Sequence, residues 1–138
     1  PDRSASFALH KSIGLTVFGL TVVRVLWRLF HRPPPYAKGM TQWRITVAHS
    51  AHLLFYVMLF LQPASGYLSS SFSGYKTRVF GIALPHWGWR DAPLNELFTE
   101  IHVMSSVLLM ILVALHFSAA LSHAFSRDDD VLRRILPW

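Results

Sequence analysis

The sequence contains no cysteine among its 138 residues, and charged residues make up only 14% of it. The lack of cysteine excludes disulfides, thiolate metal sites, iron–sulfur clusters and any cofactor attached through a thioether bond. A soluble domain usually carries about a quarter of charged residues, so the low charge argues against a soluble enzyme, a disordered tail and a nucleic-acid-binding domain. Apolar residues are abundant instead, at 52%. The formal net charge of +6 therefore fits basic loops beside a membrane better than a nucleic-acid surface.

Three long apolar stretches run from about residues 7–30, 45–68 and 97–125. Each is long enough to cross about 30 Å of hydrocarbon at about 1.5 Å per helical residue. None shows the alternation over about ten residues that the strands of a membrane barrel require. A soluble helical bundle is the alternative, but the stretches lack a polar face over most of their length. The sequence predicts an all-α membrane protein, a transmembrane helical bundle forming one domain over residues 1–138.

The basic residues suggest an orientation for these spans. Eight of them flank the short, proline-rich linker 31–44 or lie in the C-terminal tail: Arg24, Arg28, Arg32, Lys38, Arg44, Arg127, Arg133 and Arg134. The other side carries five: Arg3, Lys11, Lys76, Arg78 and Arg90. The positive-inside rule then places the 31–44 linker and the C-terminus in the cytoplasm and the aromatic-rich 69–96 loop outside. The chain starts outside at a proline, which predicts that at least one preceding helix is missing.

Histidines are the second signal, because a histidine inside a membrane span is costly unless it is paired, liganded or facing a cavity. His102 and His116 are 14 residues apart on the third span. That is almost four turns, so they share a face about 21 Å apart along the axis. Antiparallel spans place His10 at the outer level of His102. The same reasoning places three more histidines at the inner level with His116; these are His49, His52 and His123.

Opposed histidines from two membrane helices can hold a haem iron axially, and two such levels would form an electron path across the bilayer. Small residues such as Gly14 and Gly19 leave space for a planar group, although they also suit tight helix packing. A hydrogen-bonded core or interfacial histidine is the alternative, and it is preferred for His31 and His86 in the linkers. A zinc site needs three or four ligands close together, and the spacing does not favour one.

The order of motifs resembles the bacterial cytochrome b561 family, the four-helix di-haem b cytochromes of the inner membrane. The matching segments are LHKSIGLTVFGLTVVRVLWRL, AHSAHLLFYVMLFLQPASGYL, FGIALP and EIHVMSSVLLMILVALHFSAALSHAF, in this order over nearly the whole chain. The resemblance implies haem b, and some members of the family oxidise superoxide outside and reduce ubiquinone in the membrane. An oxidoreductase of this kind is therefore expected.

By matching position, the resemblance implies that His10 and His102 are the axial pair of the outer haem and that His116 is one ligand of the inner haem. The usual partner of His116 lies on the family's first helix, which this sequence lacks. Either an N-terminal extension supplies it, or His49 or His52 replaces it. One haem or two are thus expected.

His123 matches the family's quinone site, where a histidine suits proton exchange. Arg24 and Arg28 either pair with haem propionates or reach the lipid headgroups. The five outer cations either steer superoxide or are ordinary loop charges. Glu100 is expected to hold the ring of His102 through its second nitrogen.

Two other functions stay open. The chain could be a haem-bearing membrane anchor that connects a dehydrogenase to the quinone pool, with the 69–96 loop as its docking surface. It could also be a haem-free accessory subunit of a larger respiratory complex. A transporter is disfavoured, because the spans hold no acidic residue deep in the membrane.

Overall fold

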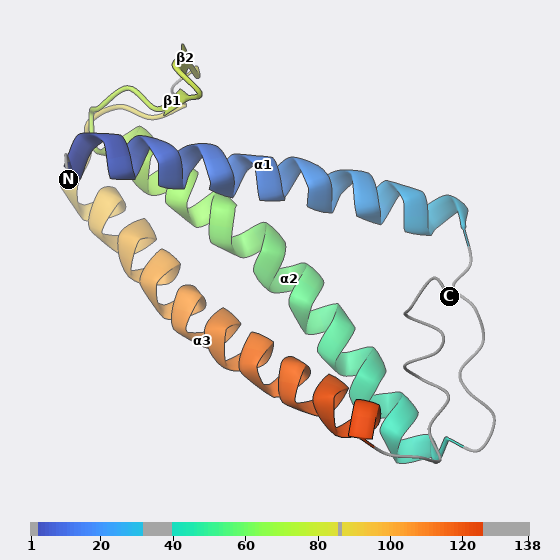
Figure 1. The fold of residues 1–138 in the computed structure, drawn as a ribbon. Coiled ribbons are helices and arrows are strands. Elements are labelled where there is room, and N and C mark those ends of the chain that lie inside the picture. Colours follow the sequence, from blue (N-terminus) through green and yellow to red (C-terminus); the bar gives the residue numbers. More distant parts are fainter. Residues whose placement is uncertain (1–2, 32–39, 86, 126–138) are drawn as a thin grey trace.

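The computed structural model describes residues 3–31, 40–85 and 87–125 and contains three long helices in this part of the chain. They are α1 (Arg3–Phe30), α2 (Gln42–Phe72) and α3 (Ala92–Phe125), and α2 lies between the other two (Figure 1). Each helix is long and apolar enough to cross a membrane. The predicted transmembrane helical bundle is confirmed.

All three helices extend beyond the apolar stretches that predicted them. α1 begins at Arg3 rather than at residue 7, α2 continues to Phe72 and α3 begins at Ala92. The segment 69–96, expected to be a loop throughout, is therefore helical at both ends. Hydropathy marks only the hydrocarbon-facing part of a helix, whereas the backbone hydrogen bonds continue into the interface. The start of α3 is capped, because the Asp91 carboxylate accepts the Leu94 N–H at 3.0 Å.

Two short strands, β1 (Arg78–Val79) and β2 (Ile82–Ala83), form an antiparallel hairpin between α2 and α3. Phe80 and Gly81 both have positive φ, as the tightest two-residue hairpin turn requires. The Phe80 N–H donates to Ser12 Oγ at 2.9 Å, which attaches the hairpin to α1. We call this end of the bundle, where α1 begins, α2 ends and α3 begins, the hairpin end, and the other the linker end (Figure 1).

Burial in the bundle is the reverse of that in a soluble protein. Among the described residues, Met58 is the one buried hydrophobic side chain, whereas the buried polar residues are Ser12, Thr21, Ser65, Ser70, Ser71, Thr77 and Ser105. Large apolar side chains cover the outside, as with Phe30 at 82% and Met110 at 71% exposure. Small polar residues between helices and apolar residues outside are what a hydrocarbon solvent favours.

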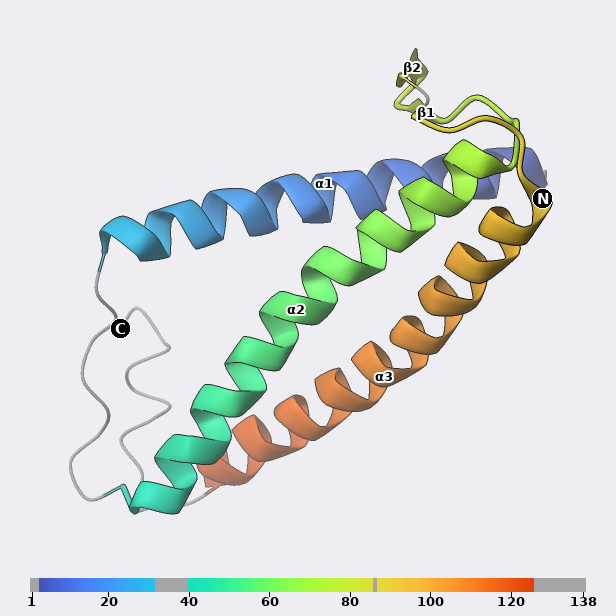
Figure 2. The same cartoon turned by 180° about the vertical axis from the view of Figure 1, so that it is seen from behind.

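The helices are not packed evenly. α2 packs more extensively on α3 than on α1. Phe18 of α1 meets Phe60 of α2 with ring centroids 5.3 Å apart, and both views show α1 and α2 diverging toward the linker end (Figures 1 and 2). This arrangement leaves several histidine side chains exposed on the described bundle.

Candidate functional site

His10 and His102 lie together at the hairpin end. His10 is near the start of α1, His102 is near the start of α3, and their ring centroids are 5.9 Å apart with nearly perpendicular planes. The sequence predicted that these two residues share a level, and the structure brings them together. Their role as metal ligands stays a prediction.

Both rings line a cavity of about 780 Å³ formed by α1, α2 and α3. Gly14 and Gly66 contribute to its wall, and so do the hydroxyl-bearing Ser70, Thr77 and Thr99. The volume lies within the range of about 300–1,000 Å³ that is usual for ligand and cofactor sites. A metal–imidazole bond is about 2 Å long, so two rings on opposite sides of one metal have centroids about 6 Å apart. The centroid spacing is therefore the one expected if His10 and His102 held one haem iron between them, and perpendicular ring planes are compatible with this role.

The partner of His102 differs from the one predicted. The Nδ1 of His102 lies 2.8 Å from the backbone carbonyl oxygen of Gln62 on α2. Glu100, expected to hold this ring, is exposed, two residues earlier and so on another side of the helix. The expectation for Glu100 is wrong. It was based on the short distance in sequence between Glu100 and His102, whereas the partner of His102 lies on the neighbouring helix α2. Neither Gln62 nor Gly66 was predicted to contact His102. The one sequence feature that could have suggested it is their spacing of about one helical turn on the second span.

Lys11 was predicted to be part of an outer rim of cations, but it points inward. Its Nζ donates to Ser70 Oγ at 2.8 Å, and the Ser70 and Thr77 hydroxyls are 2.7 Å apart. Lys11 thus lines the same cavity as the two histidines. The other rim cations whose side chains are described, Lys76, Arg78 and Arg90, are exposed.

A second pair of histidines lies toward the linker end. His52 of α2 and His116 of α3 have ring centroids 5.8 Å apart, and the ring of Phe55 packs on His116 at 5.2 Å. Of the two residues that the sequence suggested as local neighbours of His116, His52 is therefore the one in contact, and His49 lies about one turn earlier. In the described part of the chain, four histidines form these two pairs, and no group of three or more potential metal ligands is present.

His10, His52 and His116 are all exposed on the described bundle. An exposed imidazole within the span of a membrane helix is costly against hydrocarbon. A group that covers these rings and ligates them would remove that cost.

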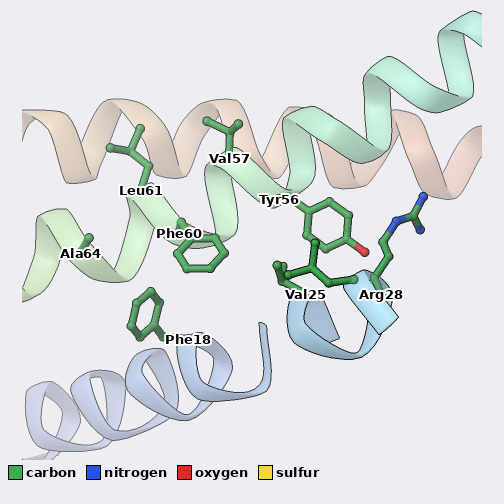
Figure 3. Close-up of a pocket in the computed structure, with 9 residues that line it drawn as sticks. Phe18, Val25, Arg28, Tyr56, Val57, Phe60, Leu61 and Ala64 are labelled. Carbon is green, nitrogen blue, oxygen red and sulfur yellow. The ribbon is translucent and has the colours of Figure 1, made fainter. Parts of the chain in front are cut away.

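Arg24 and Arg28 lie near the linker end beside Tyr56 of α2. The Arg24 Nε donates to the Tyr56 hydroxyl at 3.3 Å, and the Arg28 guanidinium lies 5.9 Å from the centre of the Tyr56 ring. Phe18 faces Phe60 in the same region, and Arg28 is at the Tyr56 end (Figure 3). The propionate and headgroup interpretations of these arginines both stay predictions.

Arg28 and Tyr56 border an open apolar groove of about 830 Å³. Its lining is Phe18, Val25, Arg28, Leu29, Tyr56, Val57, Phe60, Leu61 and Ala64. The α2 residues in this set centre on the opposite side of the helix from Phe55, Gln62 and Ser69, which contact α3. No histidine lines the groove, so it is distinct from the two histidine levels.

The remaining predicted residues are placed only in part. His123 lies at the end of α3, where its side chain is outside the described part, as are His86, the side chain of Arg3 and the C-terminal tail. His31 stacks on Trp27 with centroids 3.7 Å apart, and its Nδ1 lies 3.1 Å from the Trp27 carbonyl oxygen. This local contact at the end of α1 agrees with the interfacial interpretation of His31.

Comparisons with known proteins agree with the geometry. A family model described as "Prokaryotic cytochrome b561" matches residues 1–138. The chain is 32% identical over 136 residues to cytochrome b561 homolog 2 of Escherichia coli, covering 93% of this chain and 69% of that protein. It is 25% identical over 129 residues to the probable superoxide oxidase CybB of Yersinia pestis, covering 94% of this chain and 73% of that protein.

Proposed function

Because the chain belongs to the prokaryotic cytochrome b561 family, we propose that it carries electrons through two histidine-ligated b haems to ubiquinone. Membership itself makes the chain a multi-pass inner-membrane protein of electron transfer and implies that it binds b-type haem. The observation that carries the finer proposal is the pairing of His10 with His102 and of His52 with His116 at two levels of one bundle. A bound haem would supply one-electron redox chemistry, and the chain supplies ligation, burial and charge.

The outer haem is proposed to be held by His10 and His102. Gly14 and Gly66, which have no side chain, line the cavity that these rings share and leave volume in it. Lys11 lines the same cavity and supplies a cation. A lysine within such a cavity is suited to pair with a propionate carboxylate.

The inner haem is proposed to be held by His116 and a second histidine. His52 is the described candidate because its ring lies against that of His116. A histidine from a segment outside this sequence is the alternative, as the family resemblance implies. Arg24 and Arg28, about one turn apart, are proposed to lie near the propionates of this haem.

Ubiquinone is proposed to react near His123, at the end of α3. Its reduction takes two electrons and two protons, so the electron path has to end beside a group that exchanges protons near neutral pH. His123 lies about two turns beyond His116, near the end of α3.

Superoxide is proposed as the electron donor at the hairpin end, on the periplasmic side. Each superoxide loses one electron and becomes dioxygen, and two such electrons with two protons reduce one ubiquinone. Exposed Lys76, Arg78 and Arg90 supply the positive field that would steer a small anion. The name of the Yersinia pestis relative supports this donor. The proposal places the 69–96 loop in the periplasm and the 31–44 linker and C-terminus in the cytoplasm, as their basic residues favour.

A haem-bearing anchor subunit is the second candidate function. The surface around the hairpin exposes four aromatic side chains, at 77% for Tyr75, 70% for Phe80, 82% for Trp87 and 69% for Trp89. Exposed aromatics suit either a protein partner or the membrane interface. A stoichiometric partner that co-purifies with the wild type and is lost from a Phe80→Ser, Trp89→Ser variant would favour the anchor function.

The experiment that tests the proposal is a reduced-minus-oxidised spectrum with a haem-to-protein ratio. It compares the wild type, His102→Ala, and the control His31→Ala, whose ring stacks on Trp27 away from both pairs. Two b haems in the wild type and in the control, and one in His102→Ala, are expected. One haem in the wild type and none in His102→Ala would reduce the proposal to a single centre. No haem in any of them would refute it and leave a haem-free accessory subunit.

A further inference from the structure

One turn of α2, from Gln62 to Gly66, lies directly against the ring of His102. Gln62 contributes its backbone carbonyl to this contact, and Gly66 contributes the absence of a side chain. We propose that these two residues position His102, and with it the outer haem, by holding Nδ1 and leaving space for the ring. The inference rests on the proposed ligand role of His102.

The hydrogen bonds define which nitrogen of His102 is available. A carbonyl oxygen only accepts, so the 2.8 Å contact requires a proton on Nδ1. A neutral imidazole with that proton keeps its free electron pair on Nε2. The amide nitrogen of Gln62, a donor, lies 3.4 Å from Nε2, a long contact that requires the same tautomer. The Nδ1 contact therefore makes Nε2 the ligating nitrogen, and a metal bound there would replace the long contact with the Gln62 amide. A metal-bound histidine commonly donates its other N–H in this way.

Neighbouring hydroxyls hold Gln62 itself in place. Ser65 Oγ donates to the Gln62 carbonyl oxygen at 3.0 Å, and Ser105 Oγ donates to Gln62 Oε1. Ser65 and Ser105 are buried, with 2% and 6% of their surfaces exposed. The Gln62 side chain thus connects α2 to the turn of α3 that follows His102.

Gly66 is required by the position of the ring. A Cβ added at Gly66 would lie 2.8 Å from Cε1 and 2.9 Å from Nδ1 of His102. Any other residue would push the ring away from the Gln62 carbonyl. Gly19 offers a matched control on α1, because a Cβ there meets nothing within 4 Å.

The test compares the wild type, Gly66→Ala, Gly19→Ala and Gln62→Met as purified holoproteins. Haem-to-protein ratio, low-spin electron paramagnetic resonance signals and midpoint potentials are measured for each. Gly66→Ala is expected to lose half of the haem, or to keep the outer haem with a shifted signal and a raised potential, because weaker donation from Nδ1 lowers the basicity of the ligand. The inner haem keeps its wild-type signal and reports that the variant is folded.

The two controls decide between positioning and general packing. Gly19→Ala is expected to match the wild type in all three measurements. Gln62→Met keeps the backbone carbonyl but loses the side-chain bond to Ser105, so it is expected to retain both haems with a smaller change in the outer signal and potential than Gly66→Ala. Wild-type occupancy, signals and potentials in Gly66→Ala would overturn the inference, and so would loss of the outer haem from Gln62→Met alone. Absence of haem from the wild type would instead refute the proposed function.

If the Gly66→Ala variant does not fold, a measurement on the wild-type protein tests the inference instead. The inference requires the His102 Nδ1 proton to exchange slowly in deuterated buffer, because the Gln62 carbonyl holds it inside the bundle. Electron–nuclear double resonance on the ferric protein measures that exchange. Complete exchange within the mixing time would overturn the inference.

Discussion

Replacing Asp91 tests how the helix that carries His102 and His116 is started. The Asp91 carboxylate accepts the Leu94 N–H at 3.0 Å, and the Asp91 N–H donates to the Phe72 carbonyl at 3.0 Å. Asp91→Ala removes the first bond and keeps the second. Loss of such a cap costs about 1 kcal/mol, within a range of about 0.5–2. The negative charge near a helix N-terminus adds about 0.3–1 kcal/mol.

Two further variants separate the cap from the charge. Asp91→Asn keeps an oxygen acceptor and loses only the charge, so it is expected to fall between the wild type and Asp91→Ala. Glu96→Gln removes an exposed charge from the same end of α3 without touching the cap, and it is expected to cost a few tenths of a kcal/mol. The free energy of unfolding is measured in mixed micelles with increasing dodecyl sulfate. The reasoning is refuted if Asp91→Ala costs no more than Glu96→Gln.

Further predictions concern the membrane face and the inner level. Met110→Arg puts a charge on a side chain that is 71% exposed in mid-span, and it is expected to raise the free energy of insertion by about 2.5–3.5 kcal/mol. Ser122→Arg, near the helix end, costs much less because the side chain reaches the interface, and a glycosylation-based insertion assay compares the two. His116→Ala is expected to remove one haem, and His52→Ala to do the same; full haem content in His52→Ala would show that a residue other than His52 is the second ligand. Arg24→Gln is expected to lower the midpoint potential of the inner haem, because a nearby positive charge disfavours the ferric form; an unchanged redox titration would contradict the placement near the propionates.

The sequence by itself determined the class of protein and the levels of the histidines. Three apolar runs of membrane-crossing length have no other stable arrangement in a chain with so little charge. The spacing of His102 and His116 on one helix is a matter of helical geometry, and antiparallel succession then put His10 beside His102. These conclusions needed only local periodicity and chain direction, and the structure brought the residues together as expected.

Only the tertiary structure decided which atoms face one another. Gln62 rather than Glu100 holds His102, and Lys11 reaches Ser70 rather than the solvent, because the rotation and crossing of each helix set these contacts. Partners about 40 and 59 residues apart share no local pattern that a sequence could reveal. The rotation of α2 also decides that His52, and not His49, contacts His116. The two residues are about one turn apart on α2, and only the His52 ring lies against that of His116.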